Sequence, residues 1–312
     1  MNQATTSTTE RCSNLLLELE TDCGTTDLCT LVFKTLRQAI ADLKVEDITA
    51  FKTELESLYD LLSHTKPRFG IINYYLNQLK KFWEQEKTQD LETLRKHLES
   101  QLEQILDEIE QNKADVLDHI NELPVEGKTI LIYDHSHTVH KTLKYLHQQQ
   151  KRKFKVIVAE QDYCKTHENI EVLHDLGIPF RVVPDYMLCH IHEEIDAVFL
   201  GATTLKDTMH FVMDPGTYSL VSQFNSFKIP CYLFCCTSKF SLWPSKHLDE
   251  LSFKQDQRAH PEKEHINYER LKYSHDRVKA EHFTKIVTDE GMFTPEEIEE
   301  VFAEKLKAFG HQ

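Results

Sequence analysis

Glycine is scarce in this 312-residue chain. There are only 8 glycines, and no G-x-G-x-x-G or P-loop pattern follows any apolar run. Dinucleotide and Walker-type nucleotide sites depend on glycine-rich phosphate loops, so both are excluded. No apolar stretch approaches the roughly 20 residues that a membrane span needs. The N-terminus, MNQATTSTTE, lacks a basic region followed by an apolar one, so we expect neither membrane insertion nor secretion.

Positive charge is also in short supply. The chain has 36 Lys and Arg against 51 Asp and Glu, a formal net charge of -15. Contact with phosphate backbones needs a concentrated positive face, so a nucleic-acid partner is excluded. The dense basic patch KRKFK, Lys151–Lys155, is short and is typical of a solvated turn.

The 8 cysteines do not form a disulfide framework. Cys231, Cys235 and Cys236 share one apolar run and the others are scattered. This distribution indicates reduced thiols and a cytoplasmic protein.

The first part of the chain has helical periodicity. Between residues 91 and 120 the apolar side chains recur in steps of three and four, which places them in one stripe on a helix. Asp90 or Thr88 is the candidate N-cap. The same periodicity marks Leu28–Leu43, Ile48–Leu62 and Phe69–Phe82. These stretches predict a helical bundle that packs on a larger unit.

After residue 127 short strands alternate with helices. The strands are apolar on both faces, which predicts a buried and mostly parallel sheet. The predicted strands are Thr129–Tyr133, Phe154–Ala159, Phe180–Val183, Ala197–Gly201, Cys231–Cys235 and Lys285–Asp289. The predicted helices are Val139–Gln149, Glu168–Leu176, Thr217–Phe227 and one from Thr294, where TPEE offers a cap, a proline and an acidic first turn.

These patterns divide the chain into three parts and predict the α/β class. We expect a flexible tail over residues 1–27, rich in Thr and Ser at its start, a helical domain over 28–125 and a sheet domain over 126–312. Ligands of parallel sheets bind beyond the carboxyl ends of the strands. The loops after Ile132, after Leu200 and after Cys235 should therefore build any site.

The residues of these loops are compatible with more than one kind of site. Asp134, His135, His137 and His140 could ligate a metal, as could CHIHEE at Cys189–Glu194, but neither has the spaced pairs of a structural zinc site. We therefore predict no metal. Ser136 lies between two histidines, yet neighbouring residues rarely face each other as a triad requires, and there is no G-x-S-x-G elbow.

Two weaker possibilities remain. Gly216 and Thr217 stand at the start of a predicted helix, where free amides and the helix dipole favour an anion such as phosphate, although both residues are also ordinary helix starters. Cys236, at a strand end, is the cysteine to consider for redox chemistry, although buried cysteines usually act as small hydrophobic residues.

Taken in order, the pieces resemble one protein family. It comprises the alpha, beta and delta subunits of translation initiation factor 2B together with ribose-1,5-bisphosphate isomerase and methylthioribose-1-phosphate isomerase. The matching segments run from about Leu58 to the end of the chain. They are LLSHTKPRFGIINYYLNQL, with Lys66 where the family has arginine, ILIYDHSHTV, VIVAE, LGIPFRVVPD, IDAVFLGATTL, GTY at Gly216–Tyr218, IPCYLFCCTSKF and IVTDEGMFTPEEI.

The resemblance implies a helical N-terminal domain, a Rossmann-like C-terminal domain with a mostly parallel sheet, and dimerisation through the latter. The family's isomerases use a cysteine after the first strand and an aspartate after the fourth, where this chain has Ser136 and Thr203. Moving a carbonyl along a sugar requires groups that shuttle protons, and neither hydroxyl titrates near neutrality.

Other cleft positions depart from the isomerases as well. Their asparagine and lysine before the GT motif correspond to Met213 and Asp214, an arginine corresponds to Asp162, and a glutamate corresponds to Cys236. His135 and Lys239 still match.

We therefore expect a non-catalytic protein of the initiation factor 2B type that acts through oligomerisation and binding, without a cofactor. Its partners would be a second copy or a related subunit, and its degenerate cleft could hold a sugar phosphate or nucleotide. The alternative is a divergent sugar-phosphate aldose–ketose isomerase. The residues assigned to the cleft are Lys66, Asp134, His135, Ser136, His137, Thr203, Asp214, Gly216, Thr217 and Lys239.

Overall fold

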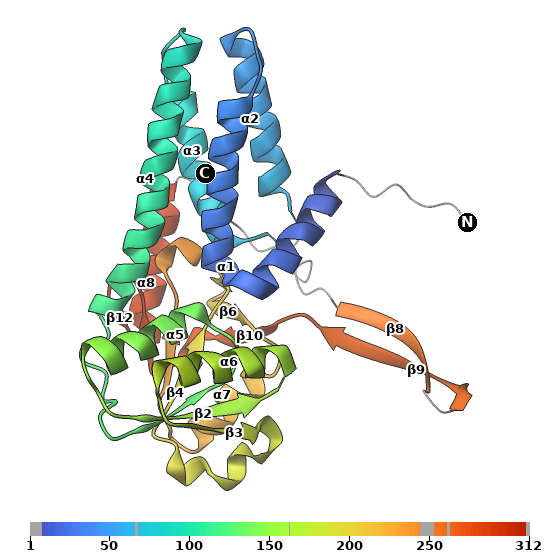
Figure 1. Ribbon diagram of the computed structural model, residues 1–312, viewed down its shortest axis with the longest axis vertical. Coiled ribbons are helices and arrows are strands. Elements are labelled where there is room, and N and C mark those ends of the chain that lie inside the picture. Colours follow the sequence, from blue (N-terminus) through green and yellow to red (C-terminus); the bar gives the residue numbers. More distant parts are fainter. Residues whose placement is uncertain (1–7, 66–67, 162, 244–252, 261–262, 310–312) are drawn as a thin grey trace.

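The computed structural model describes residues 8–65, 68–161, 163–243, 253–260 and 263–309. Four helices form a bundle that stands on an α/β domain (Figure 1). They are α1 (Thr8–Asp42), α2 (Ile48–Ser63), α3 (Gly70–Gln85) and α4 (Leu91–Asp118). None of the described helices combines the length and apolarity needed to cross a membrane.

The predicted stripe of α4 is its buried face. Leu94, Leu98, Leu102, Ile105 and Ile109 are all buried in the core of the bundle. Asp90 caps the helix by accepting a hydrogen bond from the Thr93 amide at 2.9 Å. Asp47 caps α2 in the same way through the Ala50 amide at 2.8 Å. Side-chain caps of this kind satisfy amides that lack a partner within the helix.

Residues 8–27 of the expected N-terminal tail lie in a helix. Helix α1 begins at Thr8, and its first half packs Ser13 and Leu16 into buried positions. Gly24 breaks α1 with a φ of 70°, a left-handed conformation that glycine adopts without steric cost. At this break the helix axis changes direction, so the two halves of α1 run in different directions (Figure 1).

The second domain contains a seven-stranded sheet in the order β12-β11-β7-β4-β1-β2-β3. All neighbouring pairs are parallel except β11 with β12. The strands are β1 (Thr129–Ile132), β2 (Lys155–Glu160), β3 (Phe180–Pro184), β4 (Ala197–Gly201), β7 (Cys231–Phe234), β11 (Lys285–Val287) and β12 (Met292–Phe293). The six predicted strands are thus confirmed, with small changes at their ends.

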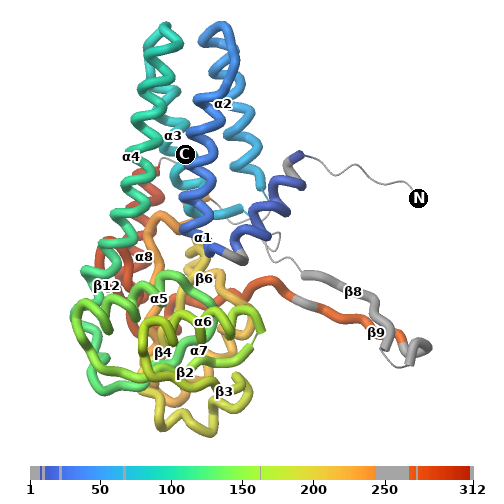
Figure 2. The backbone as a smooth tube through the Cα atoms, viewed as in Figure 1, coloured from blue at the N-terminus to red at the C-terminus, as the bar shows by residue number. Residues whose placement is uncertain are grey.

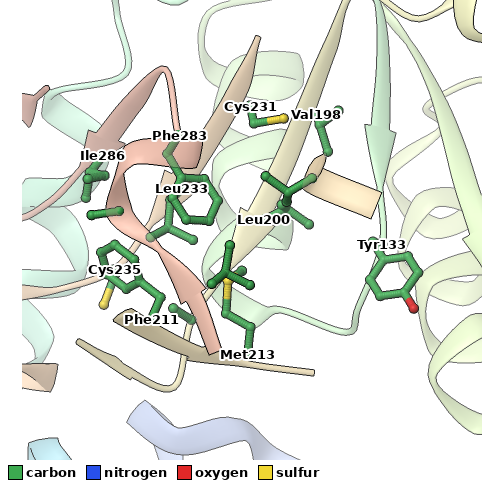
Figure 3. Close-up of a cluster of buried hydrophobic side chains, with 14 of the residues drawn as sticks. Tyr133, Val198, Leu200, Phe211, Met213, Cys231, Leu233, Cys235, Phe283 and Ile286 are labelled. Atoms are coloured by element: carbon green, nitrogen blue, oxygen red, sulfur yellow. The ribbon is translucent and has the colours of Figure 1, made fainter. Parts of the chain in front are cut away.

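Helices cover both faces of this sheet, as apolarity on both faces requires. One face packs against the end of α4, α5 (His137–Lys144), which continues as a π-helical turn over Tyr145–Gln149, and α6 (Tyr163–Leu176). The other packs against α7 (Thr217–Ser226) and α8 (Pro295–Phe309). Figure 3 shows this second cluster, in which Leu200 and Leu233 of the sheet meet Phe211 and Phe283.

The predicted start of α8 is confirmed. Thr294 and Glu297 form a reciprocal cap, in which each backbone amide donates to the other side chain, at 2.7 and 3.3 Å. Helix α8 then returns to the bundle (Figure 2), where the ammonium of Lys81 donates to the Phe309 carbonyl at 2.7 Å and the Phe309 ring stacks on Tyr74.

The remaining elements were not predicted. A three-stranded sheet joins β5 (Thr204–Leu205), β6 (His210–Met213) and β10 (Asp276–Lys279) in the order β10-β6-β5. Strands β8 (Phe253–His260) and β9 (Lys263–Tyr273) form an antiparallel hairpin that extends from the body (Figure 1). Short 3-10 turns span Asp185–His190, His192–Glu194, Thr237–Lys239 and Ala280–His282.

Candidate functional site

The loops after β1, β4 and β7 line one cleft of about 110 Å³ at the carboxyl edge of the sheet, as the topology predicted. Seven of the ten predicted residues lie on its wall: Asp134, His135, Ser136, His137, Thr203, Asp214 and Lys239. Gly216 and Thr217 are not part of that wall. Lys66 and Asp162 lie outside the described residues.

The sequence did not reveal the contribution of the helical domain to this cleft. Asp27 reaches the cleft from the start of the second half of α1, just after the break at Gly24, and Lys113 reaches it from α4. Lys165 comes from α6. The sequence places Asp27 in the expected tail and Lys113 on the solvated side of a predicted helix, so no local pattern indicates that either residue lines a cleft.

Asp27 is the centre of an ionic network. Its Oδ1 lies 2.7 Å from the Lys113 ammonium, and its Oδ2 lies 3.0 Å from Nδ1 of His137. Hydrogen bonding to His137 first, and then to Lys113, lowers the pKa of Asp27 below its usual range despite partial burial. Asp27 is therefore an anion at neutral pH, and it supplies the cleft with a negative charge from the protein itself.

A second ion pair joins Lys165 to Asp214. Burial lowers the pKa of Lys165, but the carboxylates of Asp214 and Asp134 outweigh it, and the net shift is upward. Asp134 is buried behind this pair. Its pKa is raised well above the usual value, mainly by burial and also by the charge of Asp214, although Lys165 and Lys239 act in the opposite direction.

The histidines of the loop after β1 are held by other side chains. Nδ1 of His135 lies 3.0 Å from Glu168, and Nε2 of His140 lies 2.6 Å from the amide oxygen of Asn169. Burial, followed by the charge of the neighbouring histidines, lowers the pKa of His135 to about 3. Burial lowers that of His140 to about 4, against the raising effect of Asn169. Both rings are therefore neutral at physiological pH.

These imidazoles form a contacting cluster rather than a metal centre. The ring centroid of His135 lies 4.9 Å from those of both His137 and His140. In the part of the chain that the structure describes, no group of three or more His, Cys, Asp or Glu side chains is arranged to hold a metal ion.

Ser136 has a structural task in this loop. It is the N-cap of α5, and its Oγ accepts a hydrogen bond from the Val139 amide at 3.4 Å. The end of β4 packs against it, since a Cβ added at Gly201 would lie 2.7 Å from the Ser136 Cβ. The hydroxyl of Ser136 therefore borders the cleft as part of a turn, with neither of its neighbouring histidines bonded to it in a triad.

The proposed phosphate position at the start of α7 is already occupied. The backbone amides of Gly216 and Tyr218 both donate to one carboxylate oxygen of Asp276, each at 2.9 Å. The Thr217 hydroxyl donates to the Asp214 carbonyl at 2.7 Å. The sequence leaves an external anion and plain capping open at this helix end, and in the structure the Asp276 carboxylate of β10 caps it.

Two further residues complete the wall. Lys239 is buried, and its ammonium donates to the Ala202 carbonyl at 3.0 Å. Cys236 is buried, and burial raises the pKa of its thiol to about 12, so it remains protonated and unreactive. All eight cysteines are free thiols.

Known proteins of the initiation factor 2 subunit family are similar to this chain in sequence. The profile of the initiation factor 2 subunit family matches residues 22–295. The chain is 29% identical over 133 residues to translation initiation factor eIF2B subunit delta of Dictyostelium discoideum, which covers 42% of this chain and 21% of the relative. It is 25% identical over 174 residues to eIF2B subunit alpha of the same organism, 55% of this chain and 54% of the relative. The chain thus spans about a fifth and about half of the lengths of these curated relatives.

Solved structures share the fold. A translation initiation factor eIF-2B from Pyrococcus horikoshii superposes with a TM-score of 0.73 at 19% identity, covering 93% of this chain and 98% of the other. The tetrameric eIF2B-beta2-delta2 complex from C. thermophilum gives 0.68 at 19%, covering 96% and 95%. The 5-methylthioribose 1-phosphate isomerase from P. horikoshii gives 0.72 at 16%, covering 97% and 88%. At these identities the superpositions establish the architecture, and they include both translation factors and an isomerase.

Proposed function

The chain belongs to the initiation factor 2 subunit family, and from that membership we propose that it is a non-catalytic member, a regulatory or scaffold subunit of the initiation factor 2B type. It acts through oligomerisation and binding. Its free thiols suit a cytoplasmic location.

The observation that carries this proposal is the state of the two positions where the resembling isomerases have a cysteine and an aspartate. Ser136 is engaged as the cap of α5, and Thr203 offers a second hydroxyl. A serine or threonine hydroxyl does not ionise near neutral pH, so neither residue readily serves as the acid or base of an isomerisation.

The proposed partner is a related subunit or a second copy, bound through the C-terminal domain. The solved eIF2B-beta2-delta2 complex supports this proposal because a protein of the same fold assembles there as a tetramer. Mass photometry of the purified chain, alone and mixed with related alpha-, beta- and delta-type subunits, tests it directly. A dimer or a mixed complex is expected, and a lone monomer with every candidate would contradict the proposal.

A divergent sugar-phosphate isomerase is the second candidate, and Asp134 is the observation in its favour. A buried carboxyl group with a raised pKa, two residues from the cysteine position, is the type of group that donates a proton in catalysis. Turnover of ribose 1,5-bisphosphate or methylthioribose 1-phosphate that is abolished by Asp134→Asn and by His135→Ala would establish it.

The same cleft could bind a sugar phosphate or nucleotide without turnover. A ligand that binds only the folded chain raises its melting temperature by mass action. A thermal-shift titration with both compound classes therefore separates the possibilities. A saturable shift without product formation assigns a sensing role, and no shift leaves the cleft as inherited scaffold.

A further inference from the structure

Two tyrosines stand exposed at the far edge of the sheet. The side chains of Tyr163 and Tyr186 are 76% and 79% exposed, and the neighbouring Met187 is 42% exposed. Large aromatic side chains usually bury most of their surface, so two of them in water on adjacent segments mark a site of interaction.

The fold brings the segments that carry these side chains to the same edge of the sheet. Strands β2 and β3 are parallel neighbours at the edge of the sheet, with Glu160 in register with Pro184. Tyr163 follows the end of β2 at the start of α6, and Tyr186 follows the end of β3. The carboxyl ends of parallel neighbours meet at one edge, which Figure 1 shows beside α6. We call Glu160, Tyr163, Asp185, Tyr186 and Met187 the tyrosine rim.

The rim carries negative charge, and no ion pair joins its carboxylates to a cation within the residues that the structure describes. Glu160 and Asp185 are exposed, and Asp185 accepts a hydrogen bond from the Tyr186 amide at 2.6 Å. Among the described residues, the ion pairs in this part of the domain use other carboxylates: Asp214 with Lys165, and Glu194 with Arg181.

The negative potential extends from the rim toward the cleft. Tyr133 lies just inside, buried, with its hydroxyl donating to the Pro215 carbonyl at 3.0 Å. Its pKa is raised above the usual range by burial and then by four aspartates, among them Asp185 and Asp276. The ammonium of Lys165 is already paired with Asp214.

We propose that the tyrosine rim is a docking surface for a lysine- and arginine-rich protein segment. Exposed tyrosine rings accept cations on their faces, and the carboxylates of Glu160 and Asp185 flank those rings. Tyrosine and arginine are the residues most enriched at the energetic centres of interfaces. Nucleic acid and acidic partners are repelled by the same charges. The inference extends the proposed binding role by naming the chemistry of one partner surface.

Fluorescence polarisation with the full chain tests this assignment. The probe is a labelled 15-residue peptide of alternating arginine, lysine and serine, and a glutamate-rich peptide of equal length is the negative control. Saturable binding of the basic peptide alone is expected. Tyr163→Ala with Tyr186→Ala should weaken it roughly tenfold, since two cation–π contacts are lost. Glu160→Gln with Asp185→Asn should weaken it at low salt and matter less at high salt.

Matched variants separate the rim from the general acidity of the chain. Tyr268→Ala with Tyr273→Ala removes two exposed tyrosines of β9, and Glu300→Gln with Glu304→Gln removes two exposed carboxylates of α8. Both controls should bind within twofold of the native chain. No saturable binding, binding of the acidic peptide, or equal losses in the control variants would each overturn the proposal.

Sedimentation velocity supplies the remaining outcome. Self-association lost in the tyrosine double variant would make a second copy the occupant and would also overturn the assignment to a basic segment. A failure of the peptide experiment leaves the mass-photometry test of subunit assembly intact, so the two proposals fail independently.

Discussion

Replacing Gly201 with alanine is expected to destabilise the chain through one contact in the wall of the cleft. The backbone of Gly201 lies outside the left-handed region, so alanine is conformationally permitted, but its Cβ would overlap Oγ of Ser136 and lie 2.7 Å from the Ser136 Cβ. Strand β4 cannot move aside easily because it is paired on both sides, with β1 and with β7.

Overpacking of this kind costs about 1–3 kcal/mol. For a domain of 150–250 residues each kcal/mol corresponds to roughly 2–4 °C in the melting temperature. We therefore expect Gly201→Ala to lower the melting temperature by several degrees. The comparison requires four proteins: the native chain, Gly201→Ala, Ser136→Gly and the double variant, each followed by circular dichroism during heating.

Ser136→Gly removes both atoms that obstruct the new methyl group. Glycine is a tolerable N-cap, so by itself this change should cost only a few tenths of a kcal/mol. The double variant should be more stable than Gly201→Ala, with a coupling free energy of about 1–3 kcal/mol. Alanine also reduces the conformational entropy of the unfolded chain. A Gly201→Ala protein as stable as the native chain, or no rescue by Ser136→Gly, would refute the predicted packing of this wall.

Three further predictions follow from the described contacts. Because the pKa of His140 is lowered to about 4 from 6.5, the unfolded chain binds more protons between these values. The free energy of unfolding should therefore decrease as the pH is lowered across this window, by up to about 1.4 kcal/mol per pH unit. Urea denaturation at pH 7, 6 and 5 should show a smaller dependence of this free energy on pH for His140→Gln. Asp27→Asn should cost roughly 1 kcal/mol at pH 7, since the Asp27 carboxylate is partly exposed. The cost should decline progressively as the pH falls below about 4, because the carboxyl group of the unfolded chain then takes up a proton while the native carboxylate, with its lowered pKa, stays ionised; an equal cost at pH 7 and in strong acid would contradict the ionic role. Phe309→Ala should cost about 1–2 kcal/mol, less than a fully buried phenylalanine, and should speed amide exchange in α8 while leaving α2 unchanged.

The parts of the fold that could be predicted are those decided by local periodicity. The stripe of Leu94, Leu98 and Leu102 predicts α4 because a helix repeats every 3.6 residues whatever lies beside it. The apolar strands predict a buried parallel sheet, and parallel topology alone brings three loops to one edge. Six cleft residues lie in these loops, namely Asp134, His135, Ser136, His137, Thr203 and Lys239, whereas Asp214 was indicated by the family resemblance.

The parts that could not be predicted depend on partners distant in the sequence. Strand β6 pairs with β10, and the amides of Gly216 and Tyr218 meet Asp276 from some sixty positions away. The first half of α1 places Ser13 and Leu16 in buried positions. In the sequence, Lys113 does not differ from the other polar residues of α4, and only the folded structure brings Asp27 into contact with it.

The distribution of charge connects the fold to the proposed role. Within the cleft, Asp27 pairs with Lys113 and Asp214 pairs with Lys165. A charged substrate would have to break these pairs, at the cost of leaving a partly buried ion without its partner. At the tyrosine rim the situation differs, since Glu160 and Asp185 are exposed to water beside two exposed rings, and Asp185 accepts a hydrogen bond from the Tyr186 amide. In the proposed binding role, the tyrosine rim is therefore a surface that a protein partner can engage without breaking the ion pairs of the cleft.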